Sequence, residues 1–299
     1  MKHYLKLFMV SLCVGTSSFA NITVKVTARQ AKPSFNVATG STVSLTYSEL
    51  GETHTGTFLG KLVQPDGSLN KYMLLDENQS TIYLSDPIDT VLPRLTYQTV
   101  LRQYDQVDGT CTGYAIDHLM QQLHWSNFKG NGKLAETLST EYGRTQLLVE
   151  SVNNYYLALQ HKHSIDGILE QFGTRFGFNC AKHVFTNVTE AQAYVEKHLA
   201  TGMPMLISFW IGPNMVKSSL KAEDYESRQV SDDRLWVPRK VGERKSGGHS
   251  VVAVSEFVSK GRKKLLMLDS DWHEPRVWDL EDYLGGKVKI DEIEFYGCD

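Results

Sequence analysis

The sequence lacks the features that mark several large classes of protein. Beyond residue 20, no stretch is long and uniformly apolar enough to cross a bilayer. The 31 lysine and arginine residues are outnumbered by 34 aspartate and glutamate residues, so charge gives no reason to expect a nucleic-acid partner or binding to an anionic membrane. No glycine-rich phosphate loop and no dinucleotide fingerprint occurs. Internal repeats and low-complexity tracts are also missing.

The amino-terminal segment, residues 1–20, has the pattern of a secretory signal peptide. Lys2 and Lys6 precede an apolar stretch that is too short to span a bilayer, and small residues then lead to Ala20. A lipoprotein signal ending at Cys13 is the alternative, but the residue before that cysteine is leucine, a poor match for the small residue such sites need. We therefore expect cleavage after Ala20 and a protein that is secreted or periplasmic.

Cysteine is scarce, with four in the chain. Cys13 lies in the segment expected to be removed, which leaves Cys111, Cys180 and Cys298. An odd number in an exported protein suggests one pair and one free, reactive thiol. Cys298, beside the carboxyl terminus, could join the tail to Cys180, but sequence does not report Cα separations. That disulfide stays open at this point, and if it forms, Cys111 is the thiol left over.

The hydrophobic periodicity divides the chain into two regions. Residues 21–93 contain short runs rich in β-branched and aromatic residues, such as "TVSLTY" and "KYMLL", separated by turn residues. They predict a small β-rich, barrel-like domain, which would be a propeptide or a permanent binding module. Residues 94–299 begin with helical patterns and continue with strand-like runs at 204–211, 249–257 and 263–269, which predicts an α+β domain.

Three further features of this second region can be checked against a structure. Residues 111–125 carry apolar side chains at i, i+3, i+4 and i+7 from Ile116, which predicts a helix with one buried stripe. A later helix is expected to begin with Thr189 as its N-cap and to stop at Gly202. Residues 221–246 are charged and aperiodic and are expected to form a long solvated loop.

Cys111 stands at the start of the helical pattern. Gly109 permits a tight turn before it, and Asp108 or Thr110 could cap the helix. A thiol in the first turn lies at the positive end of the helix dipole, which favours thiolate over thiol. The alternative is a packed cysteine, because free cysteine is among the most buried residue types.

A base and an orienting group for such a thiol stand later in the chain. His249 opens one apolar strand and Asp269 ends the next, and a hairpin turn at 259–262 would make them cross-strand neighbours. The carboxylate would then accept the imidazole Nδ1–H and leave Nε2 to meet the Cys111 sulfur. Asp271, two residues further on, is the alternative orienting group. A metal site using Asp269, Asp271 and His273 is conceivable, although surface polar alternation explains that pattern equally well.

The order of these residues resembles the papain-like cysteine peptidase superfamily. "CTGYAIDHL" is similar to the nucleophile segment of staphopains, while "EAQAYVEKHLATGMPMLIS" and "GHSVVAV" are similar to bacteriocin-processing peptidase domains. The resemblance covers residues 94 to about 290. It implies that Cys111 is the nucleophile, that His249 is the general base and then acid, and that Asp269 is the orienting residue.

The resemblance also implies an upstream glutamine that donates to the oxyanion. Gln106 is the nearest candidate, with four intervening residues where the pattern usually has five, and Gln103 lies too far away. The function implied is that of an exported cysteine peptidase acting on protein or peptide substrates, with no cofactor and no metal. The rival interpretations are another thiol acyl-transfer enzyme, such as a deamidase or a transglutaminase-like toxin, and a non-catalytic interaction protein with the same fold.

Overall fold

The computed structural model describes most of the chain from residue 22 onward. The described residues are 22–24, 35–47, 52–63, 70–85, 95–97, 100–101, 103, 111–126, 128–161, 165–211, 225–230, 233–238, 247–270, 275–280, 290 and 293–299. The expected signal peptide, Gln106 and Asp271 lie outside them, as do residues 108–110 and His273.

The described residues form an α+β fold with one antiparallel and one mixed six-stranded sheet, in agreement with the α+β class expected from the sequence. The central sheet has six strands in the order β15-β14-β13-β10-β16-β9. Neighbouring strands pair antiparallel throughout. The strands are β9 (Cys180–Val184), β10 (Met205–Ile211), β13 (Gly247–Ser259), β14 (Arg262–Leu268), β15 (Arg276–Asp279) and β16 (Glu294–Cys298).

Both faces of the central sheet are covered by helices, which explains why its inner strands β10 and β13 read as largely apolar runs. Alternate residues of a strand point to opposite faces. On β10, Leu206 packs in a core with α1 (Cys111–Trp125), whereas Ile207 and Phe209 pack in a second core with α5 (Val188–Leu199). The sheet therefore separates an α1 face from an α5 face.

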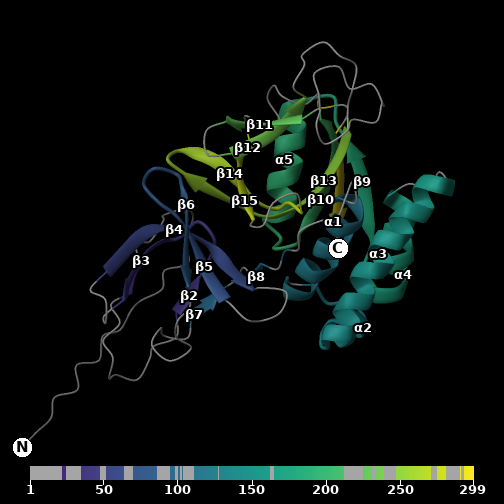
Figure 1. The fold of residues 1–299 in the computed structure, drawn as a ribbon, viewed down its shortest axis with the longest axis horizontal. Helices are drawn as coiled ribbons and strands as arrows, with labels where there is room; N and C mark the ends of the chain where they lie inside the picture. Colours follow the sequence, from purple (N-terminus) through teal and green to yellow (C-terminus); the bar gives the residue numbers. More distant parts are fainter. Residues whose placement is uncertain are drawn as a thin grey trace, which may run out of the picture.

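The remaining helices gather on the α1 side. They are α2 (Lys133–Leu138), α3 (Glu141–His161) and α4 (Ile165–Phe176), and α3 and α4 stand side by side at the end of the molecule away from the amino-terminal strands (Figure 1). Leu147 of α3 and Phe172 of α4 are buried in the same core as α1. This packing encloses α1 between the sheet and its neighbouring helices.

The sequence expectations for two of the helices need correction. Every residue of α1 from 111 to 123 is buried, so the helix is enclosed rather than buried along one stripe. Helix α5 is capped by Asn187, whose side chain accepts hydrogen bonds from the backbone N–H groups of Thr189 and Glu190. Thr189 is therefore inside the helix and not its N-cap, because the asparagine two residues earlier already supplies the acceptor. Gly202, with φ of 78°, follows the end of α5 as expected.

The amino-terminal strands form a second six-stranded sheet, ordered β1-β3-β4-β5-β6, with β8 pairing to β4. A separate two-stranded pair joins β2 and β7. These strands are β1 (Ile22–Val24), β2 (Phe35–Val37), β3 (Thr42–Tyr47), β4 (Glu52–Val63), β5 (Asn70–Leu75), β6 (Thr81–Ser85), β7 (Leu95–Tyr97) and β8 (Val100–Leu101).

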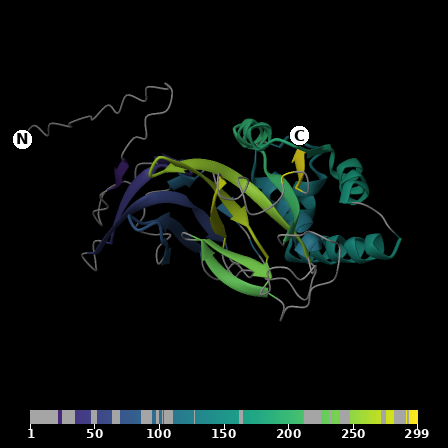
Figure 2. The same ribbon diagram turned by 90° about the horizontal axis from the view of Figure 1, so that it is seen from above.

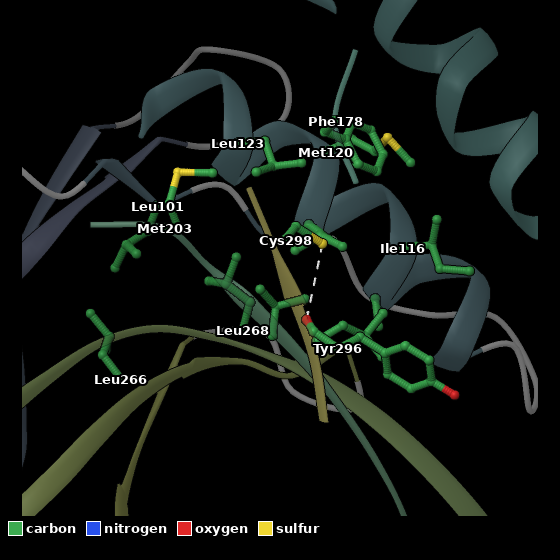
Figure 3. Close-up of a cluster of buried hydrophobic side chains, with 14 of the residues drawn as sticks. Leu101, Ile116, Met120, Leu123, Phe178, Met203, Leu266, Leu268, Tyr296 and Cys298 are labelled. Carbon is green, nitrogen blue, oxygen red and sulfur yellow. Dashed lines mark hydrogen bonds between the residues drawn. The ribbon is translucent and has the colours of Figure 1, made fainter. Parts of the chain in front are cut away.

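This amino-terminal sheet packs directly against the rest of the molecule. Leu62 of β4 and Leu101 of β8 are buried in the same core as α1, and Figure 3 shows Leu101 in one cluster with Leu123 and Met203. The long hairpin of β13 and β14 curves over toward the amino-terminal strands (Figure 2). Near its tip the hydroxyl of Ser259 donates to Gln79 Oε1 at 2.9 Å.

The sequence suggests that the charged stretch at 221–246 is one long loop, but part of it is β-structure. Residues within it form an antiparallel hairpin of β11 (Tyr225–Val230) and β12 (Asp233–Pro238). Charged residues hid the strand pattern, because the backbone pairing of a hairpin does not require an apolar face. Within the described residues, no helix is long and apolar enough to span a bilayer.

Candidate active site

Cys111 is the first residue of α1, and two contacts fix this helix start against β13. The thiol donates to the carbonyl oxygen of Gly248 with an Sγ–O distance of 3.7 Å. The next residue, Thr112, shares a hydrogen bond of 2.9 Å between its hydroxyl and that of Ser250. Ser250 in turn donates to the Ser208 hydroxyl at 3.1 Å. The residues on either side of His249 are thus the ones that hold the start of α1.

His249 and Asp269 lie in contact with each other across the β13–β14 hairpin. The His249 Nε2 atom lies 2.8 Å from Asp269 Oδ1, and both side chains are almost fully buried, with 6% and 2% of their surfaces exposed. The last recorded pair before the strand ends is Val252 with Leu268, so Asp269 comes next to Val251, diagonal to His249 on the same face.

The ring orientation differs from the expectation. We expected Nδ1–H to bond the carboxylate, but Nε2 does so. The diagonal register explains the difference, because Nε2 stands farther from the Cβ atom and reaches the more distant neighbour. This bond fixes the tautomer with a proton on Nε2 when the ring is neutral, which makes Nδ1 the basic nitrogen.

The imidazole and the helix that carries the thiol lie on opposite faces of the central sheet. His249 pairs with Phe209 across β10 and β13, and their ring centroids are 5.6 Å apart on the α5 face. Helix α1 packs on the opposite face, so the Cys111 sulfur meets β13 at Gly248, where no side chain intervenes. Within the described part of the chain, the recorded hydrogen bond of the thiol goes to this carbonyl rather than to the imidazole.

Two partners of Asp269 were missed by sequence reasoning. Arg276 of β15 donates from Nη1 to the second carboxylate oxygen, Oδ2, at 3.0 Å. The side-chain oxygen of Gln103 accepts the Asp269 backbone N–H at 3.1 Å, and Gln103 is buried. Gln103 had been considered only as an oxyanion donor. No sequence signal marked Arg276, because β15 reads RVWD with a charged residue at each end, and the burial of this arginine follows only from the fold.

His118 adds a second imidazole on the α1 side of this region. It is fully buried, and burial lowers its pKa from 6.5 to about 3, partly offset by the negative charge of Asp269. Because an imidazolium would lose its hydration there, His118 is neutral at neutral pH. It therefore adds no positive charge near Asp269 under those conditions.

The three cysteines outside the expected signal peptide are arranged as one pair and one thiol. Cys180 of β9 and Cys298 of β16 face each other in register and form a disulfide, with Cα atoms 4.0 Å apart. Cys111 is the free cysteine of the described residues, and it is buried with 5% of its surface exposed. The bond that the sequence left open is present, and the free thiol is Cys111, whose sulfur contacts the residue before His249.

The residues of this site have the chemical properties of a nucleophile, a base and an orienting acid. A sulfur can attack an electrophilic carbonyl carbon, an imidazole can carry the proton, and a buried carboxylate can hold the imidazole in place. The sequence itself matches no family model and no curated protein at a significant level.

Proposed function

We propose that this chain is an exported cysteine peptidase that hydrolyses peptide bonds through Cys111, His249 and Asp269. Residues 94–299 would be a papain-like domain, preceded by a small β-rich, barrel-like domain at 21–93. The observation that supports this proposal most directly is the placement of a thiol at a helix start, 3.7 Å from the carbonyl that precedes a histidine already bonded to a buried carboxylate.

The first chemical step transfers the thiol proton. Rotation about the Cys111 side chain would release Sγ from the Gly248 carbonyl and turn it toward His249 Nδ1. The nitrogen takes the proton, and the resulting imidazolium is stabilised by Asp269 through Nε2–H. The thiolate then attacks the carbonyl carbon of a peptide bond, and the π electrons of the C=O bond move onto the carbonyl oxygen.

The remaining steps follow from the same groups. Backbone N–H groups at the start of α1 point along the helix axis toward a developing oxyanion, and Gln106, outside the described residues, remains the proposed side-chain donor. His249 returns its proton to the leaving amine, which leaves a thioester on Cys111. Water, deprotonated by His249, attacks this thioester and releases the carboxylic acid with the thiol restored.

The amino-terminal region fits a permanent module better than a removable propeptide. Its residues Leu62 and Met73 are buried in the core that also contains α1, and Ser259 of the hairpin tip bonds Gln79. Removing residues 21–93 would expose this shared apolar surface to water. We therefore propose that the region stays attached in the active protein.

The substitution Cys111→Ala tests the proposal. We expect turnover of a fluorescently labelled casein or of a peptide library to fall by at least about a thousandfold, because the nucleophile acts as a unit with its base. The thermal midpoint should stay within a few degrees, since only one sulfur atom is removed. An alanine variant that retains turnover would refute the mechanism. Ammonia release without chain cleavage would identify a deamidase instead.

A non-catalytic interaction protein of the same fold is the second candidate, and one observation favours it. The Cys111 thiol donates to the Gly248 carbonyl, and only 5% of the residue's surface is exposed. In such a protein the sulfur would be a packed side chain at a helix start. A thiol that resists alkylation in the folded protein at neutral pH would select this candidate.

A further inference from the structure

We infer that Arg276 is a positioning residue of the proposed site, which keeps the Asp269 carboxylate ionised and aligned and thereby sets the proton affinity of His249. Its catalytic meaning rests on the proposed function. The coupling of charge among Arg276, Asp269 and His249 rests on their geometry alone and can be measured without a substrate.

The two oxygens of Asp269 are bonded to different partners. Oδ1 lies 2.8 Å from His249 Nε2, and Oδ2 lies 3.0 Å from Arg276 Nη1. The carboxylate cannot rotate about its Cβ–Cγ bond without losing both contacts. The Asp269 backbone is fixed as well, because its N–H donates to Gln103.

The three side chains form a row across three strands. Arg276 pairs with Met267, so Asp269 is diagonal to Arg276 in the same way as it is diagonal to His249. All three side chains are shielded from water, with 9%, 2% and 6% of the surfaces of Arg276, Asp269 and His249 exposed. Charge interactions are therefore screened little by solvent.

Arg276 is itself held in place. Its guanidinium carbon lies 5.6 Å from the centre of the Trp278 ring, two residues further along β15. Trp278 is buried in the core on the α5 face. A guanidinium resting on a fixed aromatic face presents its donors in one direction, which is the arrangement a bidentate or aligned carboxylate contact needs.

The charge balance of the site makes this residue more than a structural support. Arg276 is positive at every accessible pH, and Asp269 is the carboxylate it shares with His249. From α1, His118 is neutral near pH 7, and Cys111 is the group that would lose its proton. The ring facing His249 from β10 is the apolar Phe209. Removing the positive charge of Arg276 from beside the Asp269 carboxylate would increase the negative potential at the His249 ring and favour the imidazolium.

Two variants separate charge from contact. Arg276→Gln keeps an amide donor for Oδ2 but removes the charge, whereas Arg276→Lys keeps the charge without the planar fork. Arg175→Met is the matched control, because it breaks an exposed ion pair in which Arg175 Nη1 lies 2.6 Å from Glu150 Oε2. Full-length protein labelled on histidine would be titrated by NMR, and His249→Gln would identify the signal of His249 among the ten histidines.

We expect the midpoint of His249 protonation to move upward by roughly 0.5–1 pH unit in Arg276→Gln. It should return to within about 0.3 unit of the parent in Arg276→Lys and stay unchanged in Arg175→Met. Turnover in Arg276→Gln should show kcat reduced by about tenfold or more with KM changed by less than about threefold. The low-pH limb of kcat/KM, where protonation removes the His249 base, should move in parallel with the His249 midpoint.

The results would separate this inference from the proposed function. An unchanged His249 midpoint in folded Arg276→Gln would overturn the inference even if the protein is an active peptidase. A shifted midpoint in a protein without turnover would support the charge coupling while refuting the peptidase. If Arg276→Gln does not fold, Arg276→Lys decides, because a midpoint displaced by more than about 0.5 unit there would contradict the role of charge.

Discussion

The substitution Asp269→Ala should destabilise the folded protein far more than the loss of an exposed carboxylate. The carboxyl group accepts from His249 and from Arg276, with both contacts at hydrogen-bond distance. Alanine would leave the buried guanidinium of Arg276 without this anion and the His249 Nε2–H without this acceptor. Neither group gains access to water in exchange, since both are nearly covered by protein.

The expected magnitude follows from this burial. Removing one partner of a buried ion pair costs about 3–5 kcal/mol, because the other charge stays desolvated. In a protein of this size each kcal/mol lowers the thermal midpoint by about 2–4 °C. The product of the two ranges gives a fall of about 6–20 °C. The same change would also reduce any turnover, because His249 would lose its orientation.

The matched control is Glu150→Ala. Glu150 pairs with Arg175 at 2.6 Å, but their side chains are 43% and 45% exposed. Such pairs contribute about 0–1 kcal/mol, so the control midpoint should fall by no more than about 4 °C. Thermal unfolding followed by circular dichroism measures both variants. Equal, small shifts in the two variants would show that Asp269 is not the buried anchor of an ion-pair row.

Three further outcomes can be checked by unfolding experiments. Between pH 6.5 and about 3 the unfolded chain binds a proton at His118 that the folded protein does not. The free energy of unfolding should therefore decrease by about 1.4 kcal/mol for each unit by which the pH falls. Urea titrations of His118→Leu should show a smaller decrease. A Cβ on Gly113 would stand 2.7 Å from Val152 Cα, so Gly113→Ala should cost about 1–3 kcal/mol. The Cβ of Gly167→Ala would meet nothing within 4 Å, so the free energy of unfolding of this variant should rise by about 0.5–1 kcal/mol. If Gly113→Ala and Gly167→Ala changed the free energy of unfolding in the same direction, the close packing of α1 on α3 would be contradicted. Phe257→Ala removes a buried ring near the hairpin tip and should lower the free energy of unfolding by about 3–5 kcal/mol. Limited proteolysis should then cut the amino-terminal region faster. An unaltered digestion rate would argue against the shared core.

The hairpin that joins His249 to Asp269 could be predicted from sequence because its signals are local. Two apolar strands flank a short link, and the structure closes it with Lys260 and Gly261 at positive φ of 48° and 76°. The antiparallel ladder then fixes which residues are neighbours. The sequence left the Cys180–Cys298 disulfide open, because its formation depends on β9 joining β16, a contact with no local signal.

Other parts of the site could not be read from the sequence. Asp269 is contacted by Gln103, far before it in the sequence, and by Arg276, a few residues after it. No sequence spacing predicts that these residues meet. The enclosure of α1 was missed because its polar residues read as solvent-facing. In the structure, Asp117 accepts from Gln121 one turn later at 2.7 Å, so polar periodicity there reflects internal pairing rather than exposure.

Alkylation of Cys111 is the measurement that tests the central claim most directly. Iodoacetamide would be applied at pH 6 to the folded protein and to His249→Gln, with the modified residue identified by mass spectrometry. If the imidazole receives the thiol proton, Cys111 should react at least about tenfold faster in the parent than in the variant, because only the thiolate is nucleophilic. Equal rates in the two proteins would contradict a thiol and an imidazole acting together.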